Sequence, residues 1–231
     1  RVFRYFRFLS IYGEKQDSID YAAVKACSDA IPFLKMLSHD RVWVETQKIL
    51  LVDDPSIVLQ IMHSCGVLDQ ILPDAKIERL QRLLKMESQF DFEFKEINRL
   101  AALNVMKVSS WAKNFPLKKE QRRWLEKLLV NLKDSSSLRV KGYKYKMNLA
   151  IAALAVFKSD SVVRLKDEDL IDIKHGALQQ FPLGASDLLE FLPPSKKLGD
   201  ELRRLKDIWF GSELEYDRDD LLRDLEKNLS V

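Results

Sequence analysis

The sequence predicts an all-α protein, built as a multi-helix elongated array of consecutive modules. Three observations favour this class. Leu, Lys, Glu, Arg and Ala are abundant, only seven glycines and seven prolines interrupt the 231 residues, and no segment sustains the apolar–polar alternation of a strand. No apolar run approaches the roughly 18 residues that a membrane-spanning helix needs, so no membrane partner is expected.

Helices are expected along most of the chain, and the first covers residues 1–12. Its apolar residues recur on almost every side, so we expect it to be buried nearly all round. A second helix starts near Ile19, with Asp17 or Ser18 as its cap, and ends before Pro32, which lies in a connection. Capping signals and apolar periodicity predict further helices over residues 38–51, 55–66, 74–86 and 97–103.

The second half of the chain continues this pattern. Pro116 precedes a basic amphipathic helix that ends near Leu132, and residues 133–137 form the clearest loop. Ser159-Asp160-Ser161 marks a boundary before an acidic segment. Further helices are expected over residues 145–157, 198–210 and 217–229. The sequence thus divides into three modules, which cover residues 1–73, 74–158 and 159–231.

The charge distribution indicates where a polyanion would bind. Residues 118–146 hold ten Lys or Arg against three Asp or Glu, whereas residues 159–231 hold eleven against seventeen. Clustered cations bind phosphates, and interleaved tyrosines such as Tyr143 and Tyr145 stack on bases. The alternative is an ordinary solvated helix face. The residues alone leave both interpretations open; in the first, the candidate RNA contacts are Lys118, Lys119, Arg122, Arg123, Lys127, Arg139 and Lys144.

Three arginines on the first helix point to a second site. Arg1, Arg4 and Arg7 fall within one arc of about 120° on a helix of 3.6 residues per turn. A guanidinium on a buried helix requires acceptors, because it cannot lose its charge. The acceptors are either carboxylates and carbonyls of the protein, which would make the arginines structural, or a ligand such as a base edge or a phosphate.

Motifs along the chain resemble those of one enzyme family. The run Arg1-Val2-Phe3-Arg4-Tyr5-Phe6-Arg7-Phe8 resembles the end of the Glu-Asp-x-x-Arg motif of class II CCA-adding enzymes and bacterial poly(A) polymerases. Residues 37–50 resemble the family's Leu-Ser-x-Glu-Arg-Ile-x-x-Glu-Leu-x-Lys-Ile-Leu, with Asp40 in place of Glu and Thr46 in place of Leu. Further similarity covers Gly66-Val67-Leu68, Ile71-Leu72-Pro73 and the region from Phe181 to Gly199.

This resemblance implies roles for the modules, which correspond to the family's neck (1–73), body (74–158) and tail (159–231). Arg1 would read the Watson–Crick edge of incoming CTP or ATP, and Arg4 and Arg7 would make supporting ion pairs or contact the triphosphate. Arg41 and Glu45, spaced i,i+4, would pair and brace the helices around the nucleotide. The most favoured function is CCA addition to tRNA in the cytoplasm.

The family's catalytic carboxylates, which hold Mg²⁺, belong to a head domain that would precede these residues. Asp167-Glu168-Asp169 has the Asp-x-Asp pattern but no glycine-rich strand turn, so we interpret it as solvated charge. We therefore expect a chain with no catalytic residue and no metal site, inactive alone. Two alternatives remain open: a fragment of a bacterial poly(A) polymerase, and a non-catalytic helical RNA-binding adaptor from a split gene.

Overall fold

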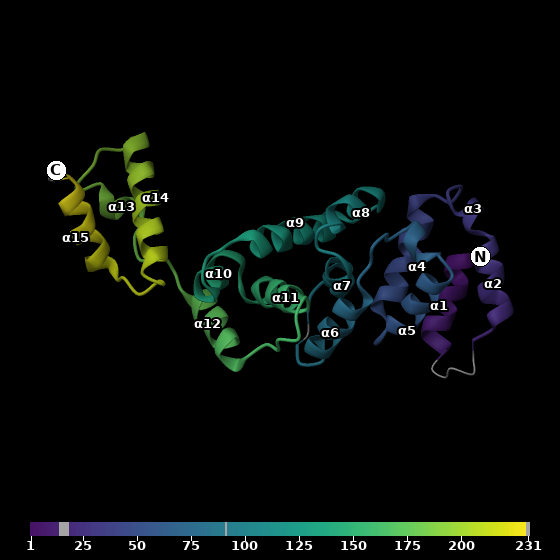
Figure 1. The fold of residues 1–231 in the computed structure, drawn as a ribbon. Helices are drawn as coiled ribbons and strands as arrows, with labels where there is room; N and C mark the ends of the chain where they lie inside the picture. Colours follow the sequence, from purple (N-terminus) through teal and green to yellow (C-terminus); the bar gives the residue numbers. More distant parts are fainter. Residues whose placement is uncertain (14–18, 91, 230–231) are drawn as a thin grey trace. The chain divides into compact units, whose positions relative to one another are not determined.

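A computed structural model of the chain describes residues 1–13, 19–90 and 92–229. In this part of the chain helices are the regular elements and no strand is present, which confirms the all-α prediction (Figure 1). In chain order they are α1 (Val2–Tyr12), α2 (Tyr21–Asp29), α3 (Ile31–Leu34), α4 (His39–Leu51), α5 (Ser56–Ser64), the 3₁₀ helix η2 (Leu68–Gln70), α6 (Ile77–Glu87), α7 (Lys95–Leu103), α8 (Val108–Asn114), α9 (Lys119–Lys133), α10 (Leu138–Tyr145), α11 (Met147–Lys158), α12 (Asp167–Leu178), α13 (Ala185–Leu188), α14 (Lys196–Gly211) and α15 (Arg218–Leu229).

The helices form two compact units. Unit 1 consists of Arg1–Leu132 and Ala152–Leu165, and unit 2 consists of Lys133–Ile151 and Lys166–Val231. Within unit 1, α1 packs on α4 and α5, and α4 and α6 pack on α7. Within unit 2, α10 packs on α12, and α13 and α15 pack on α14. The division into modules 1–73, 74–158 and 159–231 stays a prediction.

The first helix is buried on one side only. Phe3, Phe6 and Leu9 are buried against the neighbouring helices, whereas the exposed fraction of Tyr12 is 73% and Phe8 is also exposed. The expectation of a helix buried nearly all round is therefore wrong. Apolar residues recur on every side of α1, but within the described chain only the stripe at i, i+3 and i+6 is buried.

The start of α2 and the position of Pro32 also differ from the prediction. Asp20 caps α2, because its carboxylate accepts hydrogen bonds from the backbone N–H groups of Ala22 (2.9 Å) and Ala23 (3.1 Å). The predicted caps Asp17 and Ser18 lie outside the described residues. Pro32 lies in the first turn of the short helix α3, where its missing N–H leaves no bond unmade.

A buried arginine joins three segments of unit 1. The guanidinium of Arg99 on α7 donates to the Glu87 carboxylate on α6 at 2.7 Å. It also donates to the carbonyl oxygens of Leu50 and Val52 at the end of α4, each at 2.5 Å. Burial raises the pKa of Glu87, although the charge of Arg99 opposes this shift. One cation thus neutralises a buried carboxylate and satisfies carbonyls that a helix end leaves without partners.

A buried carboxylate on the same helix joins α4 to α9. Glu96 accepts hydrogen bonds from the amide of Gln47 on α4 at 3.2 Å and from that of Gln121 on α9 at 2.6 Å. The amide oxygen of Gln121 in turn accepts the backbone N–H of Lys118 at 3.0 Å. The position of the first turn of α9 is therefore set by α7, and through Glu96 by α4.

In unit 2, α10 and α12 approach each other backbone to backbone. A Cβ added at Gly142 would lie 2.1 Å from the carbonyl oxygen of Ile173, and one added at Gly176 would lie 1.7 Å from that of Arg139. No side chain fits in either place. The two glycines therefore hold the helices at a separation that any other residue would increase.

The core of unit 2 lies around Trp209. This side chain of α14 is buried and contacts the rings of Tyr143 on α10 and Phe181 at centroid distances of 5.0 and 5.4 Å. Leucines of α13, α14 and α15, together with Val140, complete the cluster. The edge-to-face contact of Trp209 with Tyr143 thus joins α14 to α10.

Replacement of Arg99 by Met is expected to destabilise unit 1 by about 3–5 kcal/mol, because it leaves the Glu87 carboxylate buried and unpaired. Urea unfolding measures the change in free energy. Arg123→Met removes an exposed guanidinium of the same unit and is expected to change it by less than about 0.5 kcal/mol. Equal effects of the two replacements would show that the Arg99 contacts contribute nothing specific.

Gly142→Ala is expected to destabilise unit 2 by about 1–3 kcal/mol, because the new methyl group forces α10 and α12 apart. Gly199→Ala is the matched control. It also lies in a helix, but a Cβ there meets no atom within 4 Å, so the replacement is expected to be neutral or to stabilise by up to about 1 kcal/mol. Thermal unfolding followed by circular dichroism compares the two, and an unchanged midpoint for Gly142→Ala contradicts the close contact.

Candidate functional site

The ion pair at the predicted nucleotide site joins two helices. Arg7 on α1 contacts Glu45 on α4, with 2.6 Å between Nε and Oε2 and with each side chain 18% exposed. The same guanidinium lies 4.5 Å from the ring centroid of Phe8. Arg41 is exposed, whereas Glu45 contacts Arg7 on the neighbouring helix. The positioning role of Arg41 and Glu45 stays a prediction.

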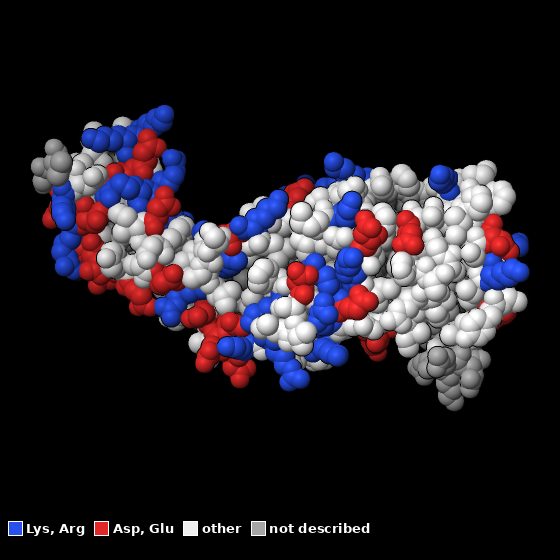
Figure 2. Space-filling model, viewed as in Figure 1, with Lys and Arg blue, Asp and Glu red and all other residues white. Residues whose placement is uncertain are grey.

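Arg1 and Arg4 lie at the surface of unit 1. The argument that all three arginines need buried acceptors fails for these two, because the side of α1 that carries them faces solvent. Most of the surface over α1 to α5 is uncharged on the face in view in Figure 2. Exposed Ile11, Phe8 and Tyr12 contribute apolar surface, and the rings of the latter two stack with centroids 6.1 Å apart. The nucleotide-binding role of the arginines stays a prediction.

The helix α9 presents its cations outward and its apolar residues inward, as its sequence pattern indicates. Leu125 and Leu128 are buried, and the indole N–H of Trp124 donates to the Asn98 side chain on α7 at 2.8 Å. Within the described chain no ion pair neutralises the exposed cations at the start of this helix, from Lys118 to Lys127, which are Lys118, Lys119, Arg122, Arg123 and Lys127. They are therefore available for a polyanion.

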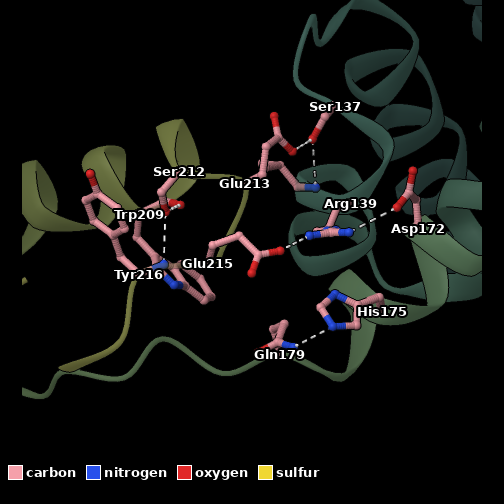
Figure 3. A network of polar contacts seen from close by, with 11 residues as sticks. Ser137, Arg139, Asp172, His175, Gln179, Trp209, Ser212, Glu213, Glu215 and Tyr216 are labelled. Atoms are coloured by element: carbon pink, nitrogen blue, oxygen red, sulfur yellow. Dashed lines mark hydrogen bonds and ion pairs between the residues drawn. The ribbon is translucent and has the colours of Figure 1, made fainter. Parts of the chain in front are cut away.

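The cations of α10 are engaged in contacts within unit 2. Arg139 forms ion pairs with Glu215 and, at 3.4 Å, with Asp172 (Figure 3). Ser137 donates a hydrogen bond to Glu213 in the same network, which ties the start of α10 to the segment after α14. Lys144 contacts Asp134 at 3.3 Å and Ser136 at 2.8 Å. Of the cations of segment 118–146 that belong to unit 2, Arg139 and Lys144 are thus engaged in ion pairs, whereas Lys133, Lys141 and Lys146 form none within the described residues.

The two tyrosines of α10 also have structural partners. Tyr143 packs against Trp209, and the Tyr145 hydroxyl donates to Asp134 at 2.9 Å. Burial, this hydrogen bond and the carboxylate charge raise the pKa of Tyr145 to about 12. Burial raises the pKa of Asp134 as well, but the hydrogen bonds that it accepts outweigh burial and lower it below its ordinary value. The hydroxyl of Tyr145 thus holds the Asp134 carboxylate in the loop before α10.

The Asp-x-Asp sequence lies in the first turn of α12. The Asp169 carboxylate accepts the backbone N–H of Lys166 at 3.0 Å, a capping contact, and Asp167 is exposed. No cluster of three His, Cys, Asp or Glu side chains able to hold a metal occurs in residues 1–13, 19–90 and 92–229. Over the same ranges, no helix has the length and hydropathy needed to cross a bilayer.

Sequence reasoning missed the residues that position α9. Glu96 and Gln121 are buried polar groups whose partners lie far away in the sequence, so no local spacing identifies them. The Arg7–Glu45 contact was missed for the same reason. Only Trp124 could have been identified from the sequence as a residue that positions α9, because it lies at the edge of the apolar stripe of this helix.

Comparison with known proteins shows similarity to CCA-adding enzymes and to a family model named for polymerase A. Residues 18–78 match a family model described as "Probable RNA and SrmB- binding site of polymerase A". The mouse protein named CCA tRNA nucleotidyltransferase 1, mitochondrial, is 24% identical over 241 residues, which cover 98% of this chain and 55% of that protein.

Solved structures of related enzymes share the fold. A CCA-adding enzyme in complex with ATP matches 99% of this chain and 60% of its own, with a TM-score of 0.63 and 15% identity. The CCA-adding enzyme of Thermotoga maritima in complex with tRNA matches 99% of this chain and 60% of its own, with a TM-score of 0.59 and 15% identity. The match to the mouse protein includes nearly all of this chain but only about half the length of that relative. The family model, the relatives and the shared fold together support a member of the family of CCA-adding enzymes and poly(A) polymerases.

Proposed function

We propose that the chain is the RNA- and nucleotide-recognition part of an RNA 3′-terminal nucleotidyltransferase, whose activity is the addition of CCA to tRNA from CTP and ATP in the cytoplasm. The observation that carries this proposal is the row of unpaired cations on α9. Five exposed cations extend from Lys118 to Lys127 on a helix whose inner face is fixed by Gln121 and Trp124. Because the helix that carries these cations is already fixed, it can bind successive phosphates without first becoming ordered.

The neck helices supply nucleotide recognition in this proposal. Arg1 donates from its planar guanidinium to acceptor atoms on the base of CTP or ATP, and Arg4 lies one turn further along the same exposed side. Arg7 acts through its ion pair with Glu45, which fixes the rotation of α1 against α4. Arg41 is assigned a positioning role on α4.

Catalysis is assigned to a head domain upstream in the parent protein. In-line transfer of a nucleotide needs carboxylates that hold Mg²⁺ at the reacting phosphate. Asp169 is used to cap α12, and we propose that this chain has no catalytic residue and is inactive alone. The exposed apolar side chains of α1, including Phe8 and Tyr12, support a further domain at this surface, because such patches mark interfaces.

Two alternatives have some support. The family model over residues 18–78 is named for polymerase A, which favours a fragment of a bacterial poly(A) polymerase. A non-catalytic RNA-binding adaptor from a split gene would use the same exposed cations at the start of α9. The sequence encoded upstream of Arg1 separates the enzyme from the adaptor, since the enzyme requires Glu-Asp shortly before Arg1 and an Asp-x-Asp strand beyond it.

Reversal of charge on α9, in the triple variant Lys119→Glu, Arg122→Glu and Arg123→Glu, is expected to weaken tRNA binding. The slope of log affinity against log salt should fall by roughly 0.7–0.9 for each phosphate that the variant no longer neutralises. Filter binding over a range of salt concentrations measures both quantities. The control reverses three exposed lysines of unit 2, Lys196, Lys197 and Lys227, and should have a much smaller effect. If the α9 variant binds tRNA like the unaltered chain, α9 is only a solvated face.

In a parent protein that carries the catalytic head, Arg1→Ala is expected to abolish the preference for CTP and ATP over the other nucleotides and to leave tRNA affinity nearly unchanged, because the altered group contacts the base alone. Sequencing of the RNA 3′ ends measures nucleotide choice. Lys48→Ala, an exposed change on α4, is the control. Unchanged nucleotide choice in the Arg1 variant removes the base-reading role.

A further inference from the structure

A recess on unit 2 gathers cations around a floor of aromatic rings. It has a volume of about 640 Å³ and lies between the end of α10, the segment after α12 and the middle of α14. One carboxylate, that of Asp207, lines it. The cations and rings that matter most are Tyr143, Lys144, Lys146, Phe181, Arg203 and Lys206. Residues 159–231 carry an excess of acidic groups, eleven Lys or Arg against seventeen Asp or Glu, so this local excess of cations runs against the charge of its surroundings.

The ammonium groups lie close to the rings. The Lys206 nitrogen is 5.1 Å from the centroid of the Tyr143 ring and 5.8 Å from that of Phe181. The Lys146 nitrogen is 5.7 Å from the centroid of Tyr143. Both rings are held from beneath by buried Trp209 and are themselves half-buried, so each keeps part of its surface exposed. The recess therefore offers ring surfaces and cations side by side.

The backbone of Lys146 adds an independent observation. Its φ of 66° and ψ of 162° fall in a region that glycine adopts readily and other residues adopt only under strain. A glycine would join α10 to α11 at lower free energy. A lysine stands there instead, with its side chain over the Tyr143 ring in the recess. Strained residues of this kind concentrate at functional positions.

We propose that this recess binds one exposed nucleotide of an RNA, with its phosphate held by Lys146, Lys206 and Arg203 and its base or ribose against the rings of Tyr143 and Phe181. The inference rests on the proposed RNA-binding function and adds a second contact to it, in a different unit from α9. Cations alone would serve an acidic peptide equally well. The rings favour RNA, because every base offers a planar face for stacking.

The test measures binding of the full 231-residue chain to tRNA and to a short single-stranded RNA that contains 2-aminopurine. Lys146→Gly is the central variant. It removes a cation and relieves the backbone strain, so it should raise the thermal midpoint of unit 2 and lower RNA affinity. Lys146→Gly combined with Lys206→Ala should lower the affinity for single-stranded RNA on the order of tenfold at about 0.1 M salt and reduce the salt slope by roughly 0.7 for each cation removed.

The control is Lys196→Ala with Lys197→Ala, which removes the same charge from exposed positions on α14 outside the recess. An equal loss of affinity in this control overturns the inference in favour of diffuse attraction. Phe181→Leu should remove the change in 2-aminopurine fluorescence on binding while circular dichroism shows an intact fold, and an unchanged signal also overturns it.

Two further outcomes separate this inference from the function on which it rests. If α9 charge reversal weakens RNA binding and the recess variants do not, the recess fails and the proposed function stands. If neither weakens it, the proposed function fails as well. Binding of a polyglutamate peptide, but not of RNA, that disappears in the recess variants would assign the recess to an acidic protein segment and overturn the RNA assignment.

Discussion

The organisation of unit 1 depends on two buried charges that lie three residues apart on α7. Glu96 and Arg99 are each less than a tenth exposed, and between them they contact α4, α6 and α9. A buried charge is costly unless all its hydrogen-bonding groups are satisfied, so these contacts allow little variation in geometry. Apolar packing alone would tolerate small rotations of α4 or α9. The polar contacts remove that freedom.

This constraint links the two regions proposed to act on RNA and nucleotide. The end of α4 is fixed by Arg99, and the same helix carries Glu45, which holds Arg7 on α1. The start of α9 is fixed by Glu96, and the same helix carries the unpaired cations. Contacts with the single helix α7 therefore fix the positions of both regions. In unit 2, Arg139 and Lys144 of α10 have internal partners, so fewer of its cations are free for a polyanion than the local charge count indicates.

Regular apolar spacing made much of the fold predictable. α4, α9, α14 and α15 follow such spacing and were predicted within a few residues, and the amphipathic division of α9 was confirmed. α8, α10 and α12 were not predicted: α8 has only seven residues, and α10 and α12 each bury one apolar side chain beside a glycine. α10 depends on Gly142, a residue that lowers helix propensity, and only the contact with Ile173 reveals its purpose. The sequence also identified the arginines of α1, but it did not show which of them would be paired. The pair joins Arg7 on α1 to Glu45 on α4, and local spacing does not reveal a contact between two helices.

The glycine contact in unit 2 has a consequence for the order in which the chain acquires structure during synthesis. α10 leaves the ribosome well before α12, and of its own residues only Val140 and Gly142 are buried. A helix of eight residues is marginal in isolation, so α10 has little to stabilise it until Gly176 has been translated. The contacts of α9 with α7, in contrast, join segments that both precede α10. The surface proposed to hold RNA can thus form on a nascent chain whose second unit is still unfolded.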